Sequence, residues 1–105
     1  MEKKPQYRVI VSDRARQMLA GHVRFLAQKS PTAARRTKNE LMDAIRSLSA
    51  MPERFPFLNM EFIPLNKYHK MFVEKRYLIL YQIKDRTVCV DCIVDCRQDY
   101  NWLVK

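Results

Sequence analysis

The run Tyr77-Leu78-Ile79-Leu80-Tyr81-Gln82-Ile83 decides the fold, because it is apolar at both its odd and its even positions. Alternate residues of a β-strand point to opposite faces of a sheet, so a strand that is apolar throughout is covered on both sides. Charged turns, Lys75-Arg76 and Lys84-Asp85-Arg86, separate this run from the segments 68–74 and 87–94. Such short connections force antiparallel pairing. The sequence therefore predicts a three-stranded antiparallel meander with residues 77–83 at its centre.

Ahead of the meander, the sequence predicts an N-terminal strand at residues 6–12 and then two amphipathic helices. Ser12 can cap the first helix. Ser30-Pro31 is a start signal for the second, since Ser caps free backbone N–H groups and Pro is tolerated at the first helical position. Pro52 marks the end of the second helix. Because the connection is short, we expect an antiparallel helical hairpin that covers one face of the meander. Its inner stripes are Ala15, Met18, Leu19, Val23, Phe25 and Leu26, then Ala34, Thr37, Leu41, Ala44, Ile45, Leu48 and Met51.

The remaining segments are predicted with less regular structure. Three prolines punctuate residues 52–67, which favours an irregular connection with a brief strand at 60–63. The short C-terminal segment 97–105 carries Tyr100, Trp102 and Leu103 and is predicted to fold onto the second face of the sheet. The expected fold class is α+β, with residues 1–105 forming a single domain.

Net charge narrows the class of partner. The chain has 20 Lys and Arg residues against 11 Asp and Glu residues, a formal net charge of +9. A surface of that sign attracts nucleic acid, anionic membrane surfaces and acidic proteins. No run approaches the roughly 18 apolar residues that a membrane span needs, and the N-terminus lacks the apolar core of a signal peptide. We therefore expect a cytoplasmic protein without a membrane partner.

The cysteines give no metal or redox site. Cys89, Cys92 and Cys96 are odd in number and crowded together, which is typical of reduced thiols rather than of a disulfide framework. In a regular strand Cys89 and Cys92 point to opposite faces and cannot bind one ion. Cys92 is then a small core residue that shares a face with Val88, Val90 and Val94. We expect no metal and no cofactor.

Several local patterns join the order of elements. Residues 77–83 fit Tyr-x-x-x-Tyr-x-Ile/Val, residues 30–34 contain Pro-x-Ala-Ala, and the last strand runs into Arg97-Gln98-Asp99. Together they span residues 7–103 and resemble the RelE/ParE superfamily of bacterial toxins, with the second and third patterns similar to its ParE branch. The resemblance implies a toxin of a type II toxin-antitoxin system whose partner is a co-expressed acidic antitoxin.

Two toxic activities occur in the superfamily. RelE-like members are mRNA interferases that cut message in the ribosomal A site with a basic cluster, whereas ParE-like members poison DNA gyrase and cut no RNA. Matched to the RelE-like pattern, Lys70 and Arg97 fall at cationic positions of the cluster. The match fails at Phe72, where a second Lys is expected, and at Leu78, where an Arg is expected. Each positioned donor on a developing oxyanion can lower the barrier by roughly 3 kcal/mol, so these losses weaken the nuclease interpretation.

The resemblance thus favours a ParE-like toxin that poisons gyrase by binding it. The alternative is a metal-free, ribosome-dependent mRNA interferase that uses Lys70, Arg76, Arg97 and Tyr100. A further alternative is an inactive toxin-derived domain that binds an antitoxin or nucleic acid. His69 beside Lys70 is more often a structural residue than a general base.

A candidate binding surface lies on the predicted helical hairpin. Its basic residues have two interpretations that the sequence leaves open, a solvated helix face or a docking surface for an acidic antitoxin or for rRNA phosphates. The candidate binding residues are Arg14, Arg24, Arg35, Arg36 and Lys38.

Overall fold

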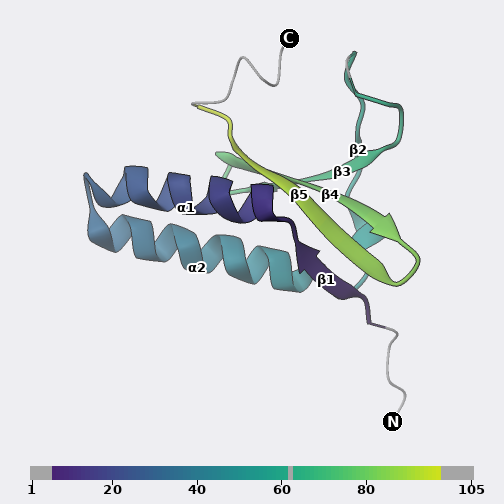
Figure 1. Ribbon diagram of the computed structural model, residues 1–105, viewed down its shortest axis with the longest axis horizontal. Coiled ribbons are helices and arrows are strands. Elements are labelled where there is room, and N and C mark those ends of the chain that lie inside the picture. Colours follow the sequence, from purple (N-terminus) through teal and green to yellow (C-terminus); the bar gives the residue numbers. More distant parts are fainter. Residues whose placement is uncertain (1–5, 62, 98–105) are drawn as a thin grey trace.

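The computed structural model describes residues 6–61 and 63–97 (Figure 1). A strand is followed by two helices, a single 3₁₀ turn and four further strands. In chain order these are β1 (Arg8–Val11), α1 (Asp13–Ala27), α2 (Pro31–Ser47), η1 (Pro52–Arg54), β2 (Phe57–Leu58), β3 (Tyr68–Val73), β4 (Tyr77–Lys84) and β5 (Thr87–Asp95). The predicted α+β class and the predicted order of strand, helical hairpin and meander are confirmed.

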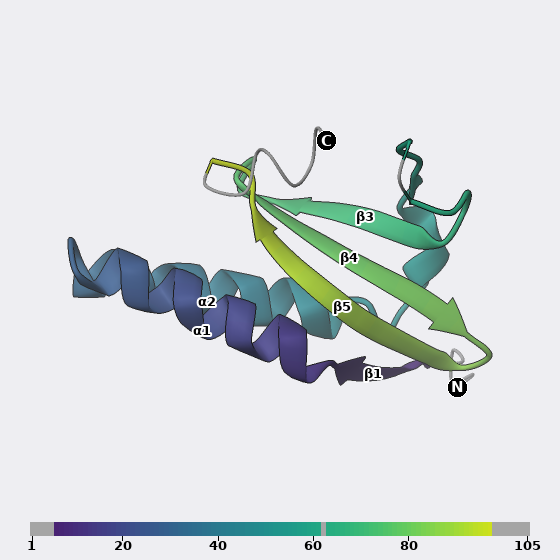
Figure 2. The same ribbon diagram turned by 45° about the horizontal axis from the view of Figure 1, so that its top comes forward.

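The strands form one mixed sheet in the order β1-β5-β4-β3-β2. β3, β4 and β5 are antiparallel neighbours with β4 in the centre, as the apolar run predicts. β1 adds to β5 in parallel, since the helical hairpin between them serves as the crossover connection that parallel pairing needs. Figure 2 shows α1 and α2 side by side beneath one face of this sheet.

Both helices begin where their capping residues predict. The Ser12 side chain accepts a hydrogen bond from the backbone N–H of Ala15 (3.0 Å), and the Ser30 side chain accepts one from Ala33 (3.1 Å). The second helix ends at Ser47, before the predicted stop at Pro52. Placing Met51 on the inner stripe is therefore wrong. Its φ of 48° turns the chain away from the helical path, and its side chain is 63% exposed.

Each face of the sheet has its own apolar cluster. The face under the helices buries Leu41, Ile45, Ile79, Tyr81 and Val90, and the second face buries Leu58, Leu78, Leu80, Cys92 and Val94. Met60 and Ile63, in the connection before β3, pack against the second face. The predicted strand at residues 60–63 is wrong, because the segment that pairs with β3 is β2, and residue 62 lies outside the described residues. The predicted packing of the C-terminal tail also lies outside them.

A β-bulge in β5 exchanges the two faces of that strand. Leu80 pairs with Cys92 and Tyr81 pairs with Val90, so Asp91 is an extra residue without a partner in the ladder. Beyond the bulge, Cys92 lies on the second face, whereas Val90 lies under the helices. The prediction that Cys92 shares a face with Val90 is therefore wrong.

The same bulge overturns the argument used against a metal site at the cysteines. Cys89 pairs with Gln82, and Cys92 pairs with Leu80, two residues before Gln82 on the same strand. Residues two apart on a strand share a face, so Cys89 and Cys92 lie on the same face rather than on opposite faces.

α1 covers the edge of β5 beyond the point where β1 ends. The backbone N–H of Ser12 donates to Val90 O (2.9 Å), and its hydroxyl donates to Asp91 O (3.2 Å). Further along, His22 Nε2 lies 2.7 Å from Ile93 O and donates to it, since a carbonyl oxygen only accepts. These bonds satisfy edge carbonyls of β5 and fix the helical hairpin against the sheet.

Candidate functional site

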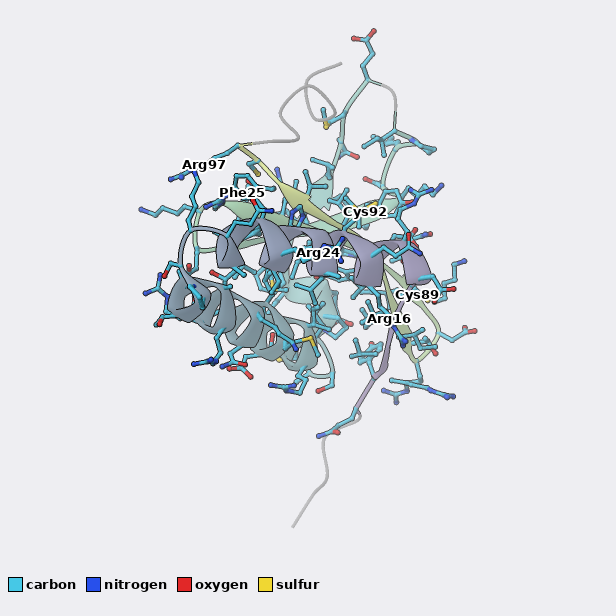
Figure 3. The ribbon with its side chains drawn as sticks, turned by 60° about the vertical axis from the view of Figure 1, so that its left-hand side comes forward. Arg16, Arg24, Phe25, Cys89, Cys92 and Arg97 are labelled. Carbon is cyan, nitrogen blue, oxygen red and sulfur yellow. The ribbon has the colours of Figure 1, made fainter. Side chains whose placement is uncertain are left out.

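A groove of about 330 Å³ opens between α1 and α2. Its floor is apolar and comes from α1, through Leu19, Ala20 and Val23, while cations stand around it. Figure 3 shows Arg16 and Arg24 on α1, and the third cation comes from α2. The lining residues are Arg16, Leu19, Ala20, Val23, Arg24 and Lys38.

The spacing of residues along α1 explains why these side chains gather. The lining residues of α1 recur at helical intervals of three and four, which places them on a single stripe of the helix. Ala15 and His22, seven residues apart, form the stripe that is buried against the sheet. Leu19 and Val23 were predicted to face the core. Both are half-buried, and Leu19 packs against the core cluster as predicted, whereas Val23 belongs to neither apolar cluster.

The electrostatics of the hairpin leave the groove positive. Two of its acidic side chains are already in ion pairs along α2, Glu40 with Arg36 (3.7 Å) and Asp43 with Arg46. Within the described part of the chain, the three cations of the groove make no ion pair with a carboxylate. The groove therefore joins an apolar floor to unneutralised positive charge.

The predicted binding residues are only partly brought together. Arg24 and Lys38 line the groove, whereas Arg35 is exposed outside it and Arg36 is paired with Glu40. Arg14 lies at the start of α1, where its Nη1 donates to the sulfur of Cys92 at 3.8 Å.

Of the three cations that line the groove, Arg16 is the one absent from the candidate binding residues. Arg16 stands eight residues before Arg24, a spacing that puts two residues on one side of a helix. That spacing, together with the apolar residues between Arg16 and Arg24, is the sequence pattern that could have predicted Arg16 as a groove residue.

The residues proposed for RNA cleavage lie on different sides of the sheet. Lys70 pairs with Leu80 and so points to the second face. Arg76 and Arg97 instead line a cavity beside the C-terminal end of α1, where Figure 3 shows Arg97 near Phe25. Tyr100 lies outside the described residues. The structure therefore brings Arg76 and Arg97 together and leaves Lys70 apart from them.

Arg76 is bound by a buried carboxylate. Its Nη2 lies 2.9 Å from Asp95 Oδ2, and its Nε lies within 3.3 Å of both carboxylate oxygens. Asp95 is 1% exposed and also accepts a bond from the backbone N–H of Arg97 (2.9 Å). Burial raises the pKa of Asp95, but the hydrogen bonds from Arg76 and from Arg97 outweigh it, and the net pKa lies below the usual value. The pair stays ionised at neutral pH.

His69 has structural partners on the face opposite Lys70. Its Nδ1 lies 2.7 Å from the carbonyl oxygen of Phe55, and its ring stacks on Tyr81 with centroids 5.2 Å apart. Phe57 contacts the ring as well, at 4.2 Å. A buried imidazole with these contacts holds the connection before β3 against the sheet.

The described residues show neither a metal-binding cluster nor a membrane-spanning helix. No group of three or more His, Cys, Asp or Glu side chains in residues 6–61 and 63–97 is arranged to hold a metal ion. Burial, outweighing the contact with Arg14, raises the pKa of the Cys92 thiol, which favours its protonated form. Within the same residues, neither helix has the length and apolar character to cross a membrane.

Comparison with known proteins gives this geometry a context. Residues 9–100 match the model of a family described as the ParE toxin of type II toxin-antitoxin system, parDE. Among solved structures, the chain is similar to one described as a chromosomal ParDE TA system from P. aeruginosa, with a TM-score of 0.70 and 10% sequence identity. The match covers 88% of this chain and 98% of that one, and at such identity it shows the fold alone. A search of curated protein sequences finds no match.

Proposed function

Because the chain belongs to the ParE toxin family of type II toxin-antitoxin systems, we propose that it is a toxin neutralised by an acidic antitoxin that docks in the groove between α1 and α2. The observation that carries this proposal is the apolar floor of the groove among cations with no acidic partner in the described chain. Family membership supplies the class of partner, and the groove supplies the surface.

The chemistry of the groove matches a segment with aliphatic and acidic side chains in alternation along a helix or an extended chain. Leu19 and Val23 offer apolar area, whose burial contributes about 25 cal/mol per Å². Exposed ion pairs contribute only about 0–1 kcal/mol each. The apolar floor would then supply affinity, while the cations steer the partner and exclude basic competitors.

A charge-reversal pair tests this docking surface. Reversing the groove charge with Arg16→Glu and Arg24→Glu should weaken antitoxin binding about tenfold or more, mainly through slower association. Arg35→Glu changes the same charge on the same hairpin outside the groove, so it is the matched control and should have little effect. Surface plasmon resonance with the co-expressed antitoxin measures both rates. Equal losses from the control and the groove variants would remove the groove from the proposal.

For the cellular target, we propose poisoning of DNA gyrase by binding. Support comes from the positions at which the nuclease pattern fails. Leu78 is 2% exposed in the core of the second face, and Phe72 is 58% exposed. Because both side chains are apolar, neither supplies a cation beside Lys70. Arg76, a cation in the turn after β3, is paired with Asp95. A phosphorane beside Lys70 would lack the two cations that the RelE-like pattern places at positions 72 and 78, which weakens metal-free RNA cleavage there.

Induced expression without antitoxin separates the candidate functions. Growth arrest with DNA damage signalling and intact message, together with gyrase inhibition by purified protein, is the expected result. Lys70→Ala with Arg97→Ala should leave this arrest in place. Rapid cleavage of translated message that the double variant abolishes would establish the mRNA interferase instead. A folded chain with no effect on growth would indicate an inactive toxin-derived domain.

A further inference from the structure

A second cavity, of about 360 Å³, lies at the far end of α1 from its N-terminus. It is formed where the last turn of α1 faces the β3–β4 turn and the end of β5. Its lining combines apolar and cationic side chains and comes from three separate parts of the chain: Phe25, Leu26, Lys29, Arg76 and Arg97. None of these residues lines the groove between α1 and α2.

The positive charge in this cavity exceeds the negative charge. Lys29, Arg76 and Arg97 carry three positive charges, and Asp95 behind them carries one negative charge, which leaves two in excess. Asp95 is 1% exposed and does not line the cavity, so a ligand in the cavity meets the cations rather than the carboxylate.

Contacts already present hold the Arg76 guanidinium and the backbone of Arg97 in place. The guanidinium of Arg76 bonds Asp95 through two nitrogens and lies 5.2 Å from the ring centroid of Tyr77. The backbone of Arg76 accepts a hydrogen bond from Cys96 N (2.8 Å), and the backbone N–H of Arg97 donates to Asp95 (2.9 Å). The β3–β4 turn is thereby tied to the end of β5. Because its guanidinium is already fixed, Arg76 loses little conformational entropy on binding an anion.

The apolar wall adds a second requirement for the ligand. The Lys29 ammonium lies 5.3 Å from the ring centroid of Phe25, which places charge directly beside an aromatic surface. Leu26 extends this wall. Guanidinium and ammonium groups together suit phosphate oxygens, and an aromatic face suits a flat heterocycle. The cavity volume is within the range of small-molecule sites.

We propose that this cavity binds a nucleoside phosphate, with its phosphate on Lys29 and Arg97 beside the fixed Arg76, and its base against Phe25 and Leu26. The site is separate from the docking groove. It gives the toxin a small-molecule ligand in addition to its protein partners.

Titration calorimetry on the purified full chain at low ionic strength tests the proposal with three probes: inorganic phosphate, adenosine 5′-monophosphate and adenosine. The monophosphate should bind at least tenfold more tightly than inorganic phosphate, and adenosine should show no binding. Equal affinity for the monophosphate and for inorganic phosphate would overturn the nucleotide assignment. Absence of binding by the monophosphate would overturn the site.

Variants locate the site within the protein. Lys29→Gln and Arg97→Gln should each weaken monophosphate binding at least tenfold, whereas Lys84→Gln, an exposed cation at the other end of β4, should leave it unchanged. Phe25→Leu should remove the advantage of the monophosphate over inorganic phosphate. A thermal unfolding curve for each variant confirms that the fold persists, and unchanged binding in both cavity variants would contradict the proposal. Antitoxin binding is not used as a readout, so failure here leaves the proposed function standing.

Discussion

Replacing Asp95 by Asn tests how much the buried ion pair with Arg76 contributes to stability. The variant keeps the shape of the side chain and removes its charge, so the guanidinium is left without a counter-ion. Breaking a buried pair in this way costs about 3–5 kcal/mol. Here Arg76 keeps 20% of its side-chain exposure, which lets solvent screen it, and the new amide oxygen can still accept one hydrogen bond. We therefore expect a loss of about 2–3 kcal/mol, which lowers Tm by about 10 °C in a domain of this size.

The loss should depend on pH in a defined direction. The pKa of Asp95 is lowered in the folded protein below its usual value, because the hydrogen bonds outweigh burial. A group with a depressed folded pKa contributes its full stabilisation above its unfolded pKa and loses it as pH falls through the folded value. The difference between the wild-type chain and Asp95→Asn should therefore be constant from neutral pH to about pH 5 and narrow below about pH 4.

Urea unfolding followed by circular dichroism across this pH range measures the effect. Asp43→Asn is the matched control, since Asp43 also pairs with an arginine but is 71% exposed. Surface pairs contribute about 0–1 kcal/mol, so the control should lose less than about 0.5 kcal/mol. Equal losses in both variants, or a difference that stays constant down to pH 3, would refute the reasoning.

Further predictions concern turns and buried hydroxyls. Tyr77→Phe removes a buried hydroxyl that has no hydrogen-bond partner among the described residues, so stability should be unchanged or slightly raised. Tyr81→Phe removes a 2.6 Å hydrogen bond to a backbone carbonyl and should cost about 1–3 kcal/mol in urea unfolding. Lys75 has a φ of 57°, a backbone conformation that a side chain disfavours. Lys75→Gly should therefore raise the midpoint of thermal unfolding, corresponding to a gain in stability of about 0.5 kcal/mol. An unchanged midpoint would contradict this strain. Burial and then the hydrogen bond to Asp91 raise the pKa of Tyr68 to about 12, so Asp91→Ala should lower it, which an ultraviolet titration of the phenol can show.

Local patterns in the sequence predict much of the fold. The helix starts follow from Ser12 and Ser30, whose capping bonds depend on residues three positions away. The central strand follows from the two-sided apolar run 77–83, and its neighbours follow from the length of the turns. The resemblance to the ParE branch, drawn from motifs spread along the chain, is confirmed by the family match over residues 9–100.

Other features depend on contacts between distant segments. The bulge at Asp91 is set by the register between β4 and β5, and a strand read alone shows regular alternation there. The parallel pairing of β1 with β5 joins opposite ends of the chain. The second cavity collects Lys29, Arg76 and Arg97 from three separate parts of the chain, so no spacing in the sequence groups them. Arg16 in the groove, by contrast, was within reach of helical periodicity.

The bonds between α1 and the edge of β5 have a consequence for the order of events during synthesis. Domains generally fold as units as the ribosome releases them, and contacts between distant segments form late. β1 and the edge-binding side chains of α1 are made first, yet their partner is the final strand of the sheet. The nascent chain must therefore wait for β5 to emerge before the helical hairpin can lock onto the sheet. The sheet therefore reaches its complete shape only after β5 has left the ribosome, even though both helices precede it in the chain.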